Sequence, residues 1–133
     1  GEHDPGPQCD GLKYTEFTER FGDPDWENDP YGVTFPGGET IAEFQIRIGA
    51  ATRALIERVG AGTAVVFCHG GVVDTVLRQA LRTSGTGIFE IHTKNTSITE
   101  FVIVRPGRSR LVRYNDAAHT ADLPVSTNRP EDF

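Results

Sequence analysis

A histidine followed by two glycines stands where a buried strand is expected to turn into a helix. Residues 63–68 form a continuous apolar run rich in β-branched residues, a pattern typical of a strand buried on both faces. Over 72–82, apolar residues recur at the intervals of one helix face. The turn between them, His69-Gly70-Gly71, would lie at the carboxyl end of a parallel strand, where α/β sheets bind ligands.

The residue types at this turn suit a bound anion. The first N–H groups of a helix have no partner within the helix, and the helix dipole favours negative charge beside them. Gly70 and Gly71 let an anion approach the backbone closely. A histidine can donate a hydrogen bond to an oxyanion, and its charge changes near neutral pH. His69, Gly70 and Gly71 are therefore predicted to bind a phosphate-like group; the alternative is that His69 is a strand-end residue without a chemical role.

Other phosphate chemistries do not fit this stretch. A cysteine phosphatase loop would need an arginine six positions after Cys68, and that position is Asp74. The sequence contains neither a GxxxxGK[ST] loop nor a G-x-S-x-G elbow. We therefore interpret Cys68 as a small residue of the buried core.

Composition describes one small acidic domain. Of the 133 residues, 37% are hydrophobic, which is enough for a core, and no apolar run is long enough to cross a membrane. The net charge of −6 argues against nucleic acid as a partner. Cys9 and Cys68 lie far apart without metal-ligand spacing, so free thiols in a reducing cytoplasm are expected.

Further elements are expected to support the turn. A helix from about Thr40 to Val59 presents an apolar stripe, with Arg47 among the charged residues that mostly form its solvated face. Strands at 97–104 and 108–114, separated by a Pro-Gly turn, predict a hairpin.

Thr15 could cap a short helix over Glu16 to Phe21, and several other segments are expected to be loops. Trp26, Tyr31 and Phe35 belong to a long acidic loop, and such aromatic residues are expected to pin it to the body of the protein or to line a pocket entrance. Residues 124–133 are expected to be a polar tail.

Several stretches, in matching order, resemble the histidine phosphatase superfamily, the phosphoglycerate-mutase-like proteins. Residues 65–76 resemble the second histidine motif of that family. The other resemblances are to the segment with the acidic proton donor (2–14), to the PGGES segment and the helix after it (35–47), to the N-x-S-[IV]-T strand start (95–99) and to the terminal N-D-x-x-H (114–119).

The resemblance implies an α/β fold with a three-layer α/β/α phosphoglycerate-mutase-like sheet, incomplete in this chain. In the family a histidine attacks phosphorus, a second histidine and two arginines bind the phosphoryl oxygens, and a carboxylic acid protonates the leaving oxygen. By position, His69 matches the second histidine, Glu2 matches the proton donor, and Gly70 and Gly71 lie in the phosphate cradle. No metal or other cofactor is implied. Glu2 could otherwise be a solvated carboxylate near a chain end.

The sequence departs from the family in one large respect. The R-H-G motif that carries the nucleophile occurs nowhere in the 133 residues, and the S-x-x-x-R-A segment with another pocket arginine is absent. Residues 1–123 are therefore expected to be the C-terminal portion of one domain of a cytoplasmic phosphomonoester hydrolase, inactive by itself. A missing N-terminal segment or a second chain would place a strand between 63–68 and 97–104; otherwise a rearrangement of the sheet would close the gap and displace His69. The alternative is a non-catalytic half-domain that binds a phosphorylated ligand or a protein partner. His3, His92 and His119 receive no catalytic role.

Overall fold

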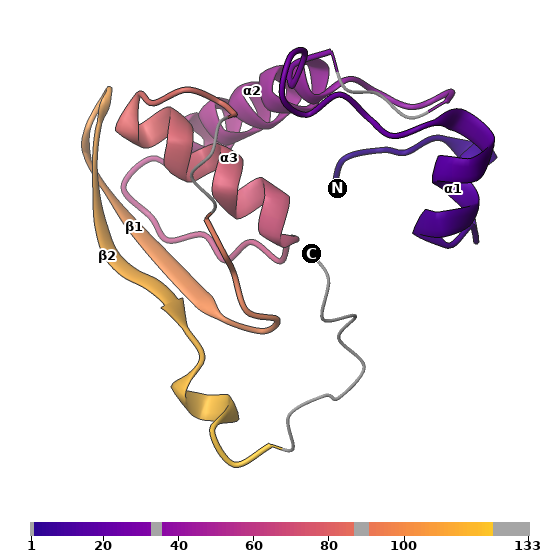
Figure 1. The fold of residues 1–133 in the computed structure, drawn as a ribbon. Coiled ribbons are helices and arrows are strands. Elements are labelled where there is room, and N and C mark those ends of the chain that lie inside the picture. Colours follow the sequence, from indigo (N-terminus) through magenta and orange to yellow (C-terminus); the bar gives the residue numbers. More distant parts are fainter. Residues whose placement is uncertain (1, 33–35, 87–90, 124–133) are drawn as a thin grey trace.

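The computed structural model describes residues 2–32, 36–86 and 91–123, so Phe35 and the expected tail at 124–133 lie outside the described residues. In the view of Figure 1, the N-terminal segment and α1 lie to one side of α2 and α3, and the β1–β2 hairpin lies to the other. In chain order the elements are a 3-10 helix Pro7–Cys9, α1 Tyr14–Phe21, α2 Ile41–Val59, α3 Gly70–Leu81, β1 Ile98–Arg105, β2 Arg108–Asp116 and a 3-10 helix Ala118–Thr120.

Residues at the two ends of the long helix α2 fix where it begins and ends. The Thr40 hydroxyl accepts a hydrogen bond from the Glu43 N–H at 3.1 Å, and the Glu43 carboxylate accepts one from the Thr40 N–H at 2.8 Å. This reciprocal capping box satisfies two N–H groups at the helix start. Gly60 ends the helix with a φ of 58°, which favours glycine. The helix expected from about Thr40 to Val59 is confirmed.

The helix α3 packs against α2 and is confirmed close to its predicted bounds. Its buried residues include Leu77 and Arg78, and the Arg78 guanidinium bonds the Asp74 carboxylate at 2.8 Å, one turn away. Across the described part of the chain, four hydrophobic side chains are buried: Phe17, Phe44, Ile48 and Leu77. The core is therefore small and lies mainly along the helices.

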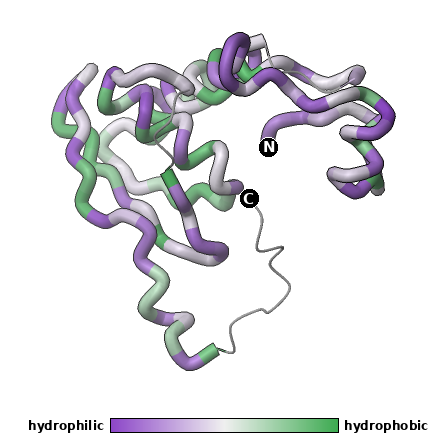
Figure 2. The backbone as a smooth tube through the Cα atoms, viewed as in Figure 1, coloured by the Kyte–Doolittle hydropathy of each residue, from purple (hydrophilic) through white to green (hydrophobic). Residues whose placement is uncertain are grey.

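The predicted hairpin is confirmed as an antiparallel pair. Phe101 of β1 lies opposite Leu111 of β2, and the chain reverses at Pro106 and Gly107. Figure 2 shows hydrophobic and hydrophilic residues alternating along the hairpin. Within the described ranges it forms a two-stranded sheet, and apolar residues of both strands, such as Val102 and Val112, are exposed. A two-stranded sheet without a covered face is marginally stable in water.

The predicted buried strand at 63–68 is wrong for this structure. No strand is assigned there, and the side chains are exposed, with Val65 at 78% and Phe67 at 96%. The interpretation of Cys68 as a buried core residue is wrong for the same reason, since it is exposed. A strand exists through hydrogen bonds to a neighbouring strand, and the described residues place none beside this run. The chain combines helices with strands, but its described sheet is antiparallel and not parallel as expected.

The aromatic loop residue Tyr31 pins its loop to the helices. Its hydroxyl shares a hydrogen bond with the Ser84 hydroxyl at 2.9 Å and accepts one from the Gly85 N–H at 3.2 Å. Its carbonyl accepts the N–H of Ala42 at 3.1 Å, at the start of α2. Trp26 is half exposed. For Tyr31, the expectation that loop aromatics hold the loop to the body is confirmed.

Candidate active site

His69 occupies the position directly before α3, as the sequence predicts. Its backbone is extended, and its carbonyl accepts the N–H groups of Val72 at 3.1 Å and Val73 at 3.3 Å, which opens the helix. The His69 side chain makes no capping hydrogen bond to the helix and is 69% exposed. The imidazole therefore stands at the helix start, beside N–H groups that have no partner within the helix.

Glu2 lies against the same turn. Its Oε2 is 4.0 Å from Nδ1 of His69, and its Oε1 accepts the N–H of His3 at 3.1 Å. A Cβ atom built on Gly71 would lie 2.5 Å from Oε1 of Glu2, closer than real Cβ contacts come. The glycine is thus what lets the carboxylate reach the first turn of α3. The structure brings together the two residues that the sequence predicts as catalytic.

Gly70, the other predicted phosphate-cradle residue, faces Thr93. A Cβ atom built on Gly70 would meet Cβ of Thr93 at 3.7 Å, an ordinary contact. The Thr93 hydroxyl is buried and has no hydrogen-bond partner within the described ranges. Thr93 is a neighbour of the site that sequence reasoning missed, because it belongs to none of the motifs.

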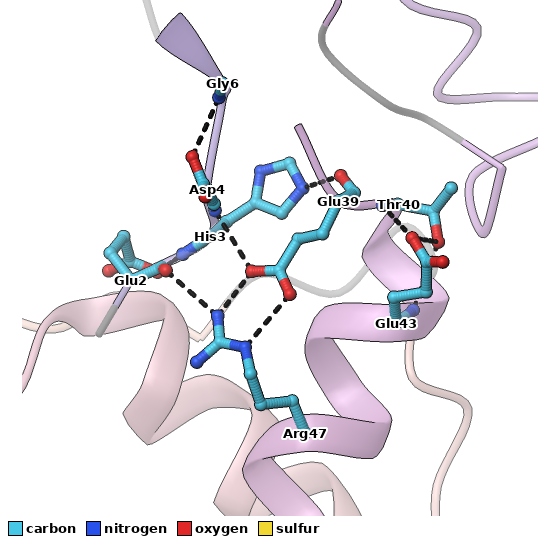
Figure 3. Close-up of polar contacts among 8 residues, drawn as sticks. All are labelled: Glu2, His3, Asp4, Gly6, Glu39, Thr40, Glu43 and Arg47. Atoms are coloured by element: carbon cyan, nitrogen blue, oxygen red, sulfur yellow. Dashed lines mark hydrogen bonds and ion pairs between the residues drawn. The ribbon is translucent and has the colours of Figure 1, made fainter. Parts of the chain in front are cut away.

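An arginine on α2 holds the backbone of Glu2 (Figure 3). Arg47 Nε donates to Glu39 Oε2 at 3.0 Å, and its terminal nitrogen forms a short contact with Glu39 Oε1 and donates to the carbonyl of Glu2 at 3.1 Å. Glu39 Oε1 also accepts the N–H of Asp4 at 3.0 Å. Arg47 is exposed, as expected for the solvated face of α2, and the fold brings residues 2–4 within reach of its guanidinium.

Backbone contacts reinforce this junction. The Glu39 N–H donates to the carbonyl of Asp4 at 3.1 Å, and the His3 Nε2 atom lies 2.6 Å from the carbonyl of Glu39. The His3 ring meets the buried ring of Phe44 edge-on, with centroids 5.8 Å apart. A Cβ atom on Gly38 would lie 2.2 Å from the carbonyl oxygen of Asp4, so the two segments touch through their backbones. His3 therefore has a structural role, which the sequence did not indicate.

The Arg47–Glu39 pair is charged at neutral pH. The hydrogen bond from Arg47 is the largest cause that lowers the pKa of Glu39, and the same bond raises the pKa of Arg47. Each shift favours the ionised form, as expected for a bidentate pair. The pair can thus hold residues 2–4 across the neutral pH range.

The pKa of Cys68, directly before His69, depends in part on the charge of Glu2. Neighbouring atoms displace part of the water around the thiol, and this desolvation, followed by the negative charge of Glu2, raises the pKa of Cys68 although the residue is exposed. A raised pKa means less thiolate at a given pH. Glu2→Gln is therefore expected to lower the pH midpoint of Cys68 alkylation.

Peptide mapping after a pulse of iodoacetamide at a series of pH values measures this midpoint. Cys9, which lies on the 3-10 helix Pro7–Cys9, is the internal control whose midpoint should not move. An unchanged midpoint for Cys68 would contradict the placement of Glu2 beside this turn.

The remaining histidines, His92 and His119, belong to other segments of the chain. The carbonyl of His92 accepts the Tyr114 hydroxyl and, at 3.2 Å, the Asn115 side-chain amide. His119 is exposed in the 3-10 helix Ala118–Thr120. In the part of the chain that the structure describes, His, Cys, Asp and Glu side chains form no group able to hold a metal ion. No helix in that part is both long and apolar enough to cross a membrane.

Comparison with known proteins gives a match to one family. No curated protein and no solved structure matches the chain. A sequence model described as the histidine phosphatase superfamily (branch 1) matches residues 2–117, which include Glu2, His69 and the α2 helix between them. The match covers most of the 133 residues, so the chain belongs to the histidine phosphatase superfamily.

Proposed function

We propose that this chain is the C-terminal part of a phosphomonoester hydrolase that works through a phosphohistidine, and that it is inactive by itself. The observation that carries the proposal is the meeting of Glu2, His69 and Gly71 at the start of α3. A hydrogen-bond donor, a carboxyl group and free helix N–H groups at one point suit the transfer of a phosphoryl group.

Each of these groups has a place in the reaction. His69 and the N–H groups at the helix start bind non-bridging oxygens of the phosphoryl group, whose charge they stabilise in the transition state. A nucleophilic histidine from outside this chain forms the N–P bond as the P–O bond to the leaving group breaks. Protonated Glu2 gives its proton to the leaving oxygen. In the second step the Glu2 carboxylate takes a proton from the water that attacks phosphorus, and the N–P bond breaks to release phosphate.

The same proposal includes completion of the sheet into a three-layer α/β/α arrangement. A missing N-terminal segment or a second chain would supply a strand between 63–68 and β1. Three observations support this: the apolar side chains of 63–68 are exposed, the hairpin is uncovered, and the hydroxyls of Thr93 and Ser97 are buried with no partner among the described residues. Each unsatisfied buried polar group costs about 1–3 kcal/mol, so an added strand that bonds such groups is favoured.

A second candidate is a non-catalytic half-domain that binds a phosphorylated ligand or a protein partner. The absence of an R-H-G motif from the 133 residues favours it, because the turn His69-Gly70-Gly71 is present without the family's nucleophile. For the hydrolase the ligand is a phosphomonoester or a phosphate ion, and for both candidates the proposed location is the cytoplasm. The two differ in covalent chemistry, which can be measured.

The test is covalent labelling with a radioactive phosphodonor. The 133-residue chain alone is expected to take up no acid-labile, base-stable label, whereas the full-length gene product is expected to take up label on a histidine outside this chain. Stoichiometric label on His69 would show that the chain has its own nucleophile and that the assigned roles are wrong. A full-length product that binds phosphate but takes up no label would establish the non-catalytic candidate.

A further inference from the structure

We propose that Arg47 and Glu39 are positioning residues that hold the proton donor Glu2 at the start of α3. The inference rests on the proposed function, since it assumes that Glu2 is the donor. It assigns a role in that reaction to two residues that lie outside the phosphate-binding turn. Figure 3 shows Arg47 pointing from α2 toward both Glu39 and the backbone of Glu2.

Glu39, which lies just before α2, makes three of the hydrogen bonds that hold residues 3 and 4. Its carboxylate accepts the N–H of Asp4, its own N–H donates to the carbonyl of Asp4, and its carbonyl lies within hydrogen-bond distance of His3. Arg47 adds the bond to the carbonyl of Glu2 itself. These bonds hold the backbone from the Glu2 carbonyl to Asp4, and the Glu2 side chain extends from there to His69 and Gly71.

The guanidinium is held by more than its carboxylate partner. Its central carbon lies 5.3 Å from the ring centroid of Phe44, the buried residue whose edge also receives His3. Contacts with the Glu39 carboxylate, the Glu2 carbonyl and an aromatic face together need a planar group with several N–H donors. Lysine at this position would keep the charge but could not make all these contacts at once.

A positioning role predicts a dependence on the leaving group. An alkyl phosphate leaves as a strongly basic alkoxide and needs the proton donor, whereas p-nitrophenolate leaves without protonation. The ratio kcat/KM reports the steps up to formation of the phosphohistidine, so it leaves out the later hydrolysis in which Glu2 acts on water. In the full-length gene product, Glu2→Gln is expected to lower kcat/KM for an alkyl phosphate by about 10²–10⁴-fold and to change kcat/KM for p-nitrophenyl phosphate by less than about threefold. Arg47→Ala should show the same selectivity with a loss of roughly 10–100-fold, and Arg47→Lys should lie between it and wild type.

Arg53→Ala is the matched control, because Arg53 is an exposed arginine on the same helix; it should change neither rate. If Glu2→Gln shows the selectivity and Arg47→Ala lowers both rates equally or neither, the positioning role is refuted while the proposed function stands. If wild type hydrolyses neither phosphate, the proposed function fails.

A second measurement decides the positioning role without activity. The NMR signal of the Gly71 amide should shift in Glu2→Gln, because the carboxylate lies against this residue. Arg47→Ala and Glu39→Gln should reproduce that shift in the full-length protein, and Arg53→Ala should not. A Gly71 signal that responds to Glu2→Gln but not to Arg47→Ala would overturn the inference.

Discussion

His69→Ala is expected to lower kcat of the full-length gene product by about 10²–10³-fold, which corresponds to about 2.7–4 kcal/mol of lost transition-state stabilisation. The imidazole stands at the start of α3, where it can donate to a phosphoryl oxygen as negative charge develops. Stability should change little, because the side chain is mostly exposed and makes no capping bond to the helix.

Steady-state rates with p-nitrophenyl phosphate and thermal melts of wild type and His69→Ala test this expectation. Since p-nitrophenolate needs no proton donor, kcat/KM for this substrate isolates phosphoryl stabilisation from proton transfer by Glu2. A melting temperature that falls by many degrees while kcat stays normal would reverse the assignment and make His69 a structural residue.

Gly71→Ala is expected to lower activity while stability stays the same or rises. Alanine in the first turn of α3 favours the helix by about 0.5–1 kcal/mol over glycine. Its Cβ atom would lie 2.5 Å from Oε1 of Glu2, at the flexible end of that side chain, so the carboxylate must move away. We expect an unchanged or higher melting temperature and a loss in alkyl phosphate hydrolysis of roughly 10–100-fold.

The leaving group again provides the internal control for Gly71→Ala. Displacement of the Glu2 carboxylate should lower kcat/KM for an alkyl phosphate and spare kcat/KM for p-nitrophenyl phosphate, since only the first needs a proton donor. An equal loss on both substrates would mean that the new methyl group obstructs the phosphoryl group instead. Unchanged rates on both would show that the proton donor does not depend on this approach to α3.

The elements that form from short-range interactions could be predicted from the sequence. The helix α2 is set by the capping box of Thr40 and Glu43 and by Gly60 at its end, all within one or two turns of the residues they serve. The start of α3 after His69 and the hairpin around Pro106 and Gly107 follow from local spacing in the same way. Glu2 and His69 were placed in one site by the resemblance of their motifs to the family.

What the tertiary structure decided depends on residues far apart in the sequence. The composition of 63–68 suits a buried strand. A strand also needs hydrogen bonds to a neighbouring strand, and the described residues place no neighbouring strand beside 63–68. Helical periodicity puts Arg47 on a polar face, whereas only the docking of residues 2–4 shows that this face holds the candidate proton donor. Likewise, Gly71 reads as a phosphate-cradle glycine in the sequence, and the fold adds that its missing side chain makes room for Glu2.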